Sequence, residues 1–398
     1  MLSIRHKVRF LTTAVLMVSS CGVSTQDQEP SIVHGPYLQQ LTDSSVMVVW
    51  HTNVEATSWV EYGTRSDLES FPVQGSAAHT ARNSRHGLID AYTKLHQVVI
   101  TGLEPGQEYR YRIFSKLMLD FKRYKVKYGE TIASEVFSFT TLDNDKGSFS
   151  FAVLGDIHGN KTRLESMLSQ FSWEHVDLVF FNGDLLDYYD DESQIMDGFL
   201  DVSVRHFAKE VPLILVRGNH ETLGKSARKW IEHFPTSSGR FYYSFDHGPV
   251  HFIILDSGVE VADSHRLLWG LADSDRYRAE QAEWLRHDIA SEAFADAAFT
   301  IVLFHIPIFG AGGAHGAIHA REMWNDILND AGVDLVLNAH LHRFLHREPT
   351  GGENLYHAVV SGANTLARVD VSAESLSVAV TEADGKVVDR LSILAQRR

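Results

Sequence analysis

Two patterns of apolar and polar positions divide the chain. From residue 32 to residue 141, short apolar segments alternate with polar positions and are separated by turn residues. Alternation with a period of two, interrupted at regular intervals, is typical of antiparallel strands. The run 103–106 ends in Pro-Gly and suits a tight turn, because proline fixes φ and glycine accepts a positive φ. We therefore predict an all-β sandwich over residues 32–142. The predicted strands lie at 46–50, 59–62, 97–100, 109–114 and 136–140.

After the polar linker at 143–147, apolar strands alternate with segments of helical period. This order predicts an α/β domain with a partly parallel sheet over residues 148–398. The expected strands lie at 149–154, 177–181, 213–216, 251–255, 299–304 and 334–338, and the expected helices at 162–171, 276–292 and 318–331.

The first 20 residues have the pattern of an export signal. Three basic residues precede an apolar run at 10–18, which is too short to span a bilayer as a mature helix. Small residues then precede Cys21, and residues 18–22 resemble the bacterial lipobox. That resemblance implies a signal peptide at 1–20 and lipidation of Cys21. It also implies a polar tether at 21–31 and a chain anchored to the cell envelope, at the outer membrane or cell surface. An ordinary secretory signal, which gives a periplasmic or secreted protein, is the alternative.

Composition and charge narrow the range of partners. The formal net charge is -15, and it becomes more negative without residues 1–20, which hold three basic residues and no acid. Such a surface repels polynucleotides, so we expect no nucleic-acid polymer as partner. The basic and aromatic stretch 116–128 is an exception. It has the composition to contact an anionic ligand or a membrane surface, although a solvated hairpin or loop is the simpler explanation and the one we expect.

Possible metal ligands follow five predicted strands in succession. Open α/β sheets build their sites at the carboxyl ends of strands, where these residues fall. A single Asp after a strand often caps a helix, and a single buried His is usually hydrogen-bonded. Five strand ends with this chemistry instead predict metal binding. The residues are Asp156, His158, Asp184, Asn219, His305, His340 and His342.

These blocks resemble the calcineurin-like metallophosphoesterase superfamily, in order, across residues 149–347. The segment 33–39, Trp50, residues 62–63 and His96 with the 103–106 turn resemble the fibronectin-III-like N-terminal domain of purple acid phosphatases. The run 241–245 and Gln281 resemble the catalytic half of that family. The resemblance implies an αββα sandwich behind an all-β domain.

The resemblance also implies how the residues share two metal ions. Asp156, His158, Asp184 and His342 hold one ion, and Asp184 bridges to a second ion held by Asn219, His305 and His340. Carboxylates and neutral imidazoles suit Fe, Mn or Zn. A hydroxide that bridges the metals is then the nucleophile. His220 is the expected general acid or charge stabiliser, and Glu221 is a candidate to orient it.

Three positions depart from the purple acid phosphatase pattern. His158 replaces a glycine, and Asp187 occupies the position of the tyrosine whose phenolate colours ferric iron, with Tyr188 one place later. We therefore expect a colourless enzyme. Ala339 stands where a glycine is usual, which is tolerated if its φ is negative.

Other polar residues near the site have less specific patterns. His315 and His319 lie in a glycine-rich run that we expect to be a flexible loop, either touching substrate or serving only as a connection. Residues 190–192 are acidic and either face the pocket or cap the next helix. His247 and His251 flank an apolar strand and are expected to be structural.

The predicted function is hydrolysis of small phosphate monoesters. A phosphodiesterase acting on nucleotides or lipid head groups uses the same ligands and is the nearest alternative. A surface lipoprotein that binds through its sandwich, with an inactive catalytic domain, is a more distant one. The intact ligand set argues against it.

Overall fold

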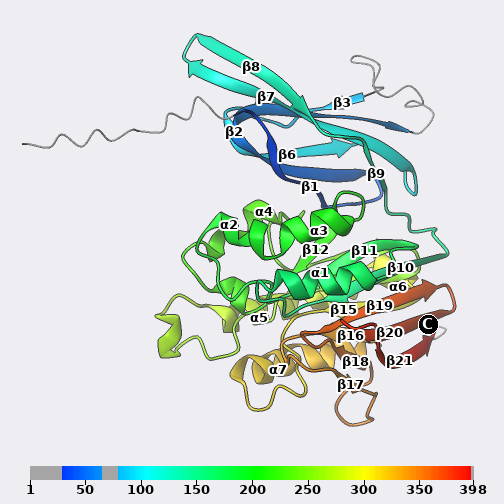
Figure 1. Cartoon of the computed structure of the whole chain (residues 1–398). Coiled ribbons are helices and arrows are strands. Elements are labelled where there is room, and N and C mark those ends of the chain that lie inside the picture. Colours follow the sequence, from blue (N-terminus) through cyan, green and yellow to red (C-terminus); the bar gives the residue numbers. More distant parts are fainter. Residues whose placement is uncertain (1–28, 65–78, 396–398) are drawn as a thin grey trace, which may run out of the picture.

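The computed structural model describes residues 29–64 and 79–395 and shows a β-sandwich above a larger α/β part (Figure 1). The predicted signal peptide and Cys21 lie outside these ranges. Among the helices that the structure describes, none has the length and apolar character needed to cross a membrane.

The sandwich consists of antiparallel strands, as predicted. Its central strand β2 is longer than expected: the segments 46–50 and 59–62, predicted as two strands, form one continuous strand. The N-terminal half of β2 pairs with β6, and after a register break between His51 and Ala56 the C-terminal half pairs with β7. One bent strand thus serves both layers around a core that includes Trp50 and Tyr111. The strands are β1 (Ile32–Gln39), β2 (Ser45–Thr64), β3 (His79–Ala81), β4 (Ser84–Arg85), β5 (Leu88–Ile89), β6 (Thr93–Thr101), β7 (Glu108–Lys122), β8 (Lys125–Ala133) and β9 (Phe137–Thr140).

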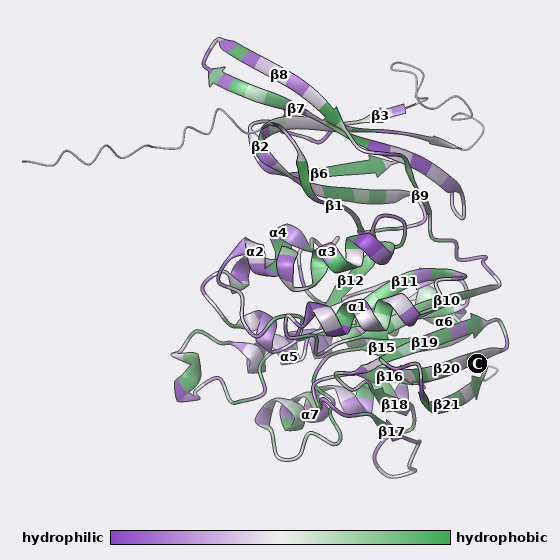
Figure 2. Ribbon diagram, viewed as in Figure 1, coloured by the Kyte–Doolittle hydropathy of each residue, from purple (hydrophilic) through white to green (hydrophobic). Residues whose placement is uncertain are grey.

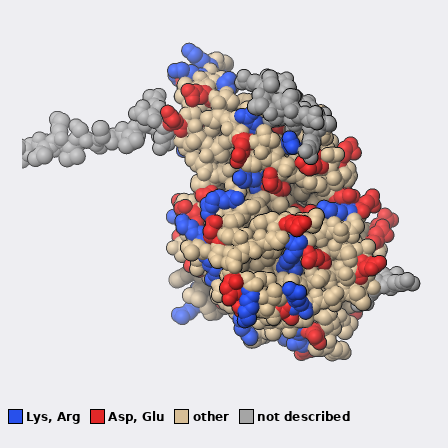
Figure 3. Space-filling view, turned by 45° about the vertical axis from the view of Figure 1, so that its right-hand side comes forward, with Lys and Arg blue, Asp and Glu red and all other residues tan. Residues whose placement is uncertain are grey.

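The basic stretch forms the β7–β8 hairpin, with Lys122 opposite Lys125 at the turn. Tyr124 at its tip is 92% exposed. The space-filling view shows basic side chains at this end of the sandwich, while both charges are mixed over the rest of that face (Figure 3). The stretch is therefore an exposed hairpin.

The sandwich is fixed to the α/β part by buried polar contacts. The Tyr37 hydroxyl donates to the His233 carbonyl at 3.0 Å, and the Gln39 amide donates to the Leu213 carbonyl at 2.7 Å. Tyr37 also belongs to the apolar core of the α/β part. Because these buried groups are paired across the boundary, separating the two parts would leave them without partners.

The α/β part holds two sheets packed face to face. The first has the strand order β12-β11-β10-β19-β20-β21 and the second β13-β14-β15-β16-β18-β17. Neighbours among β10–β12 run parallel, as do β14, β15, β16 and β18. The strands of the first sheet are β10 (Ser148–Leu154), β11 (Val176–Asn182), β12 (Leu213–Val216), β19 (Thr365–Ser372), β20 (Ser375–Glu382) and β21 (Val387–Leu394). Those of the second are β13 (Tyr243–His247), β14 (Val250–Ile254), β15 (Phe299–Leu303), β16 (Leu335–Asn338), β17 (Leu345–Arg347) and β18 (His357–Val360).

Helices cover both outer faces, which confirms the αββα fold. Phe151 and Phe180 meet Ile301 and Leu337 between the sheets, and the central strands β10–β12 are largely apolar (Figure 2). Helix α1 packs on the first sheet, and α5 and α7 pack on the second. The helices are α1 (Lys161–Gln170), α2 (Glu192–Ile195), α3 (Asp201–Ser203), α4 (Trp230–His233), α5 (Ser274–Asp288), α6 (Glu292–Asp296) and α7 (His315–Asp330). Short helical turns are η1 (Met196–Leu200), η2 (Val204–Ala208), η3 (His220–Thr222), η4 (Ala227–Lys229) and η5 (Arg266–Leu268).

Local capping explains two features of the helices. The helix predicted over 276–292 ends at Asp288, and Ser291 starts α6 by accepting a hydrogen bond from the Phe294 amide. Asp191 caps α2 in a capping box with Gln194. The acidic run at 190–192 thus contributes a cap, one of the two roles expected for it.

His247 and His251 have structural partners, as expected. His247 Nε2 lies 2.8 Å from an Asp177 oxygen. His251 is buried between Asp246, at 2.6 Å, and Asp288, at 3.1 Å. Burial alone lowers the pKa of His251, but the hydrogen bonds and charges of the two carboxylates outweigh it and raise the pKa to about 9.

This pair of contacts predicts a pH-dependent stability. Because folding raises the pKa of His251, its protonation stabilises the fold at pH values below its unfolded pKa near 6.5. This contribution is lost as the pH rises towards 9. Relative to His251→Gln, the wild type should be more stable by on the order of 3 kcal/mol near pH 6, with the gap closing by pH 9. Urea unfolding across this range measures it, with the exposed His287→Gln as control. A gap that does not change with pH would contradict the assignment.

Candidate metal centre

The predicted ligands come together from both sheets. Asp156 and His158 follow β10, Asp184 follows β11, and Asn219 follows β12 in the first sheet. The second sheet contributes His305 after β15, and His340 and His342 after β16. All of these strand ends point to one edge, as expected for a site at the carboxyl ends of parallel strands.

The backbone at these residues is unusual. Asp156, His158, Asp184, His340 and His342 all have positive φ, between 51° and 71°. Residues other than glycine rarely adopt this left-handed conformation, which costs about 1–3 kcal/mol each, and such residues cluster at functional sites. The turns therefore aim these side chains at a common point against their local preference.

Glycines at the strand ends make room for this convergence. A Cβ on Gly183 would lie 2.4 Å from His305 Nδ1, and one on Gly218 would lie 2.4 Å from Asp184 Oδ1. Both positions require glycine for close approach. Ala339 is different: it is buried and is not among the residues with positive φ, so its methyl group fits, as the sequence predicted.

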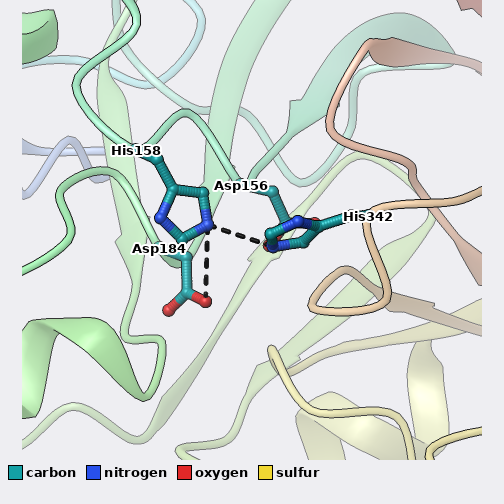
Figure 4. A group of neighbouring side chains, drawn as sticks. All are labelled: Asp156, His158, Asp184 and His342. Atoms are coloured by element: carbon teal, nitrogen blue, oxygen red, sulfur yellow. Dashed lines mark hydrogen bonds and ion pairs between the residues drawn. The ribbon is translucent and has the colours of Figure 1, made fainter.

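One cluster consists of Asp156, His158, Asp184 and His342, each of which offers a ligand atom within 4.8 Å of the others (Figure 4). His158 Nε2 lies 3.1 Å from His342 Nε2 and 4.0 Å from Asp184 Oδ2. His342 Nε2 lies 3.8 Å from Asp156 Oδ1. This is the set of residues expected around the first ion.

A second cluster shares Asp184 and adds His305 and His340. His305 Nε2 lies 2.9 Å from Asp184 Oδ2, and the Asn219 side-chain oxygen lies 3.0 Å from His340 Nδ1. Asp184 is therefore the carboxylate common to both clusters, the place expected for a bridging ligand.

The donor set fits metal ions. Asp156 Oδ2 is a buried atom without a hydrogen-bond partner, although it lies among potential ligands. Buried polar atoms are normally satisfied, so such an atom directed at a cluster of carboxylates and imidazoles suits an ion. His305 Nδ1 lies 2.7 Å from the Asn182 carbonyl, so it carries the hydrogen and leaves Nε2 as the ligand atom.

Burial and neighbouring charges shift the ionisation of the cluster. Burial raises the pKa of Asp156 to about 6. Burial also opposes ionisation of Asp184, but the charge of His305 outweighs it and lowers the Asp184 pKa. Burial lowers the pKa of His305, but the charge of Asp184 outweighs burial and raises this pKa to about 10. Asp184 is thus a negative carboxylate beside the cationic imidazole of His305. A bound cation would replace the proton on that imidazole.

Asp187 supports two histidines, which the sequence reasoning missed. Its Oδ1 lies 2.7 Å from His158 Nδ1, and its backbone carbonyl lies 2.7 Å from His220 Nδ1. A hydrogen bond at Nδ1 fixes the ring and directs Nε2 the other way, towards the cluster. In the sequence, only its place three residues after Asp184 connected Asp187 with the site. That position bore on the colour of the metal centre and not on hydrogen bonds to the histidines.

Glu221 does not orient His220, which corrects the expectation. Its buried carboxylate instead accepts hydrogen bonds from the amides of Asp184, Leu185 and Gly218, each at 2.8 Å. Burial, and then the charge of Asp184, raise its pKa to about 7. Glu221 therefore joins the turn after β11 to the turn after β12.

The prediction of a flexible loop at His315 and His319 is wrong. Both lie in the first turns of α7, facing Asp275 at the start of α5, and His315 Nε2 is 2.9 Å from Asp275 Oδ1. Gly316 packs tightly, since a Cβ there would lie 2.3 Å from the Val259 carbonyl oxygen. The glycine thus allows close packing. The residues after it continue the helix, whose apolar face is buried in the core beside the second sheet.

Comparison with protein families defines the class. The model of calcineurin-like phosphoesterases matches residues 149–344, and the model of the purple acid phosphatase N-terminal domain matches residues 33–141. The two matches together span most of the chain, which belongs to the calcineurin-like phosphoesterases. Its pairing of domains is, more particularly, that of the purple acid phosphatases.

Individual relatives agree with this. The chain is 24% identical to probable purple acid phosphatase 20 of Arabidopsis thaliana, over 80% of this chain and 70% of the relative. It is 25% identical to acid phosphatase type 7 of Mus musculus, over 84% of this chain and 75% of the relative. A purple acid phosphatase from yellow lupin (Lupinus luteus) seeds has a similar fold, with a TM-score of 0.68 and 17% identity, covering 93% of this chain and 75% of that chain.

The three amides held by Glu221 generate a prediction. Glu221→Ala leaves them buried without an acceptor, so the free energy of unfolding should fall by at least about 2 kcal/mol. The metal content should fall with it, because the Asp184 turn loosens, while Glu221→Gln, which keeps one acceptor, should lie between. Thermal unfolding and elemental analysis measure both.

The matched control is Glu283→Ala, which removes an exposed carboxylate on α5. If Glu221→Ala is as stable and as rich in metal as this control, the link between the two turns is not needed.

Proposed function

We propose that the protein is a metal-dependent phosphatase that hydrolyses small phosphate monoesters. The observation that carries this proposal is the pair of ligand clusters sharing Asp184 at one edge of two sheets. The domain pairing supports the monoester preference, since relatives with the same pairing are named acid phosphatases.

The proposed ligands divide as the sequence suggested. Asp156, His158 and His342 would hold one ion, and Asn219, His305 and His340 would hold the other, with Asp184 shared between them. Bound Fe, Mn or Zn would supply positive charge that stabilises the phosphoryl transition state and activates water. The protein's contribution is to keep Asp184 ionised and to present Nε2 of each supported imidazole.

His220 is the proposed general acid. Its Nδ1 faces the Asp187 carbonyl, which only accepts, so Nδ1 carries a hydrogen and Nε2 exchanges a proton at the site. Nε2 lies 4.0 Å from Asp184 Oδ2, and the side chain is partly exposed. It therefore stands where a leaving alkoxide emerges to solvent and needs a proton.

We propose further that the chain is exported and anchored to the bacterial envelope through lipidated Cys21. The anchor would attach to the tether at 21–31, followed by the sandwich at 32–142 and the catalytic domain at 148–398. With Asp187 supporting His158 in place of a tyrosine, a colourless enzyme stays our prediction.

Hydrolysis of matched esters tests the function. Protein lacking residues 1–21, loaded with Mn, Fe or Zn, should hydrolyse a nitrophenyl phosphate monoester with at least about 10-fold higher kcat/KM than the diester. Asp184→Asn should lose both ions and at least about 100-fold in rate, since it removes the shared ligand.

Two other outcomes would identify the alternatives. A higher kcat/KM for the diester would favour the phosphodiesterase that acts on nucleotides or lipid head groups. Absence of hydrolysis with every metal, together with tight glycan binding, would favour a surface-binding lipoprotein.

The role of His220 predicts a dependence on the leaving group. His220→Ala should slow hydrolysis of an alkyl phosphate by about 100-fold or more, because alkoxide departure needs a proton. A nitrophenyl ester, whose phenolate leaves without one, should be affected much less. Equal losses on both esters would remove the general-acid role, and His287→Ala serves as the surface control.

A further inference from the structure

An open hollow with a volume of about 640 Å³ lies between chain segments that also carry residues of the metal centre. We call it the η5 pocket, after the turn that forms one wall. Its lining is largely apolar on the loop side, with basic residues on the opposite side. The residues used below are Arg217, Leu223, Lys225, Arg228, Leu267, Trp269 and Leu271.

The walls of the η5 pocket are joined to the centre through short stretches of chain. Arg217 is two residues before the ligand Asn219, and Thr222, also in the lining, is two residues after His220. On the other wall Val259 precedes Glu260, whose carboxylate lies 3.5 Å from His340 Nε2. Two walls of the pocket are therefore built by segments that also carry Asn219, His220 and Glu260.

The loop at 261–273 presents large apolar side chains to solvent. Trp269 is 86% exposed, Leu271 71% and Leu267 67%, and the loop stands out in yellow-green at the left of the α/β part (Figure 1). Large apolar residues gathered in one exposed patch are typical of a binding surface. Trp269 also has a φ of 52°, a strained conformation for this residue.

The base of the loop is held firmly, so this exposure belongs to a fixed structure. Asp263 accepts hydrogen bonds from the amides of Ser274 and Asp275, both at 2.9 Å. The buried Arg278 donates to the carbonyls of Ser257 and Val259 at 3.0 and 2.7 Å. The apolar tip is thereby carried on a rigid frame.

We propose that the η5 pocket receives the leaving group of the substrate and selects phosphate esters of alcohols that carry a large aromatic group. The proposal rests on the proposed phosphatase function. An aromatic group seated here would cover Trp269 and its neighbouring leucines while the phosphate stays at the metal centre.

The opposite wall adds a polar rim. Among the described residues, neither Lys225 nor Arg228 has a carboxylate within 4.0 Å, whereas Arg217 pairs with Asp256 and Arg276 with Asp273. The unpaired cations keep this wall hydrated and attract the anionic substrate towards the centre.

Two esters with similar alkoxide leaving groups test the proposal: 3-phenylpropyl phosphate and propyl phosphate. The wild type should prefer the phenyl ester in kcat/KM, mainly through KM. Trp269→Ala and Leu267→Ala should each reduce that preference by roughly 5- to 10-fold, the size of an aromatic contact. The control Tyr124→Ala removes an aromatic residue that is equally exposed but lies on the distant β7–β8 hairpin.

Equal kcat/KM for the two esters in the wild type, or an undiminished preference in both loop variants, would overturn the proposal. Hydrolysis of neither ester would instead count against the phosphatase function. The pocket is then judged by calorimetric binding of the same two compounds: tighter binding of the phenyl ester that Trp269→Ala abolishes supports it, and equal binding overturns it.

Discussion

The centre depends on one constraint: strand ends from two sheets must bend sharply enough to aim buried charges at a common point. The left-handed backbone at Asp156, Asp184 and His340 is unfavourable in isolation. It persists because the apolar contacts between the sheets fix where the strands end. Glu221 then ties two of the turns together through backbone amides. The fold thus positions the ligands of the site, which is what dinuclear chemistry requires.

The same packing explains the electrostatics. Asp156 and Asp184 are both buried, and two such carboxylates repel each other in a low-dielectric interior. The imidazolium of His305 compensates for this by standing 2.9 Å from Asp184. A cation can take over that role, so the unfavourable burial of charge and the affinity for metal have one origin.

The sequence predicted the parts of this structure that follow from local pattern. Strand ends after apolar runs located Asp156, Asp184 and His305, and alternation located both domains. It could not distinguish a helix start from a loop at His315, because Gly316 serves close contact with Val259 rather than flexibility. Nor could it predict the partners of Glu221 and Asp187, since these depend on turns that meet only in the folded chain.

The exposure of the apolar loop at 261–273 could not be predicted from the sequence for the same reason. Leu267, Trp269 and Leu271 are ordinary residues in sequence, and only the structure shows them exposed around the η5 pocket. The metal ligands are thus fixed by the sheets, whereas the η5 pocket is shaped by a loop. Chemistry and selectivity can then vary separately, as is usual when a rigid scaffold carries loops.

The most direct test of the account is a crystal structure of the Mn-loaded protein with anomalous scattering. The account predicts two ions per chain, roughly 3.5 to 4 Å apart, with an oxygen of Asp184 in contact with both. A single ion, or two ions of which only one touches Asp184, would contradict it.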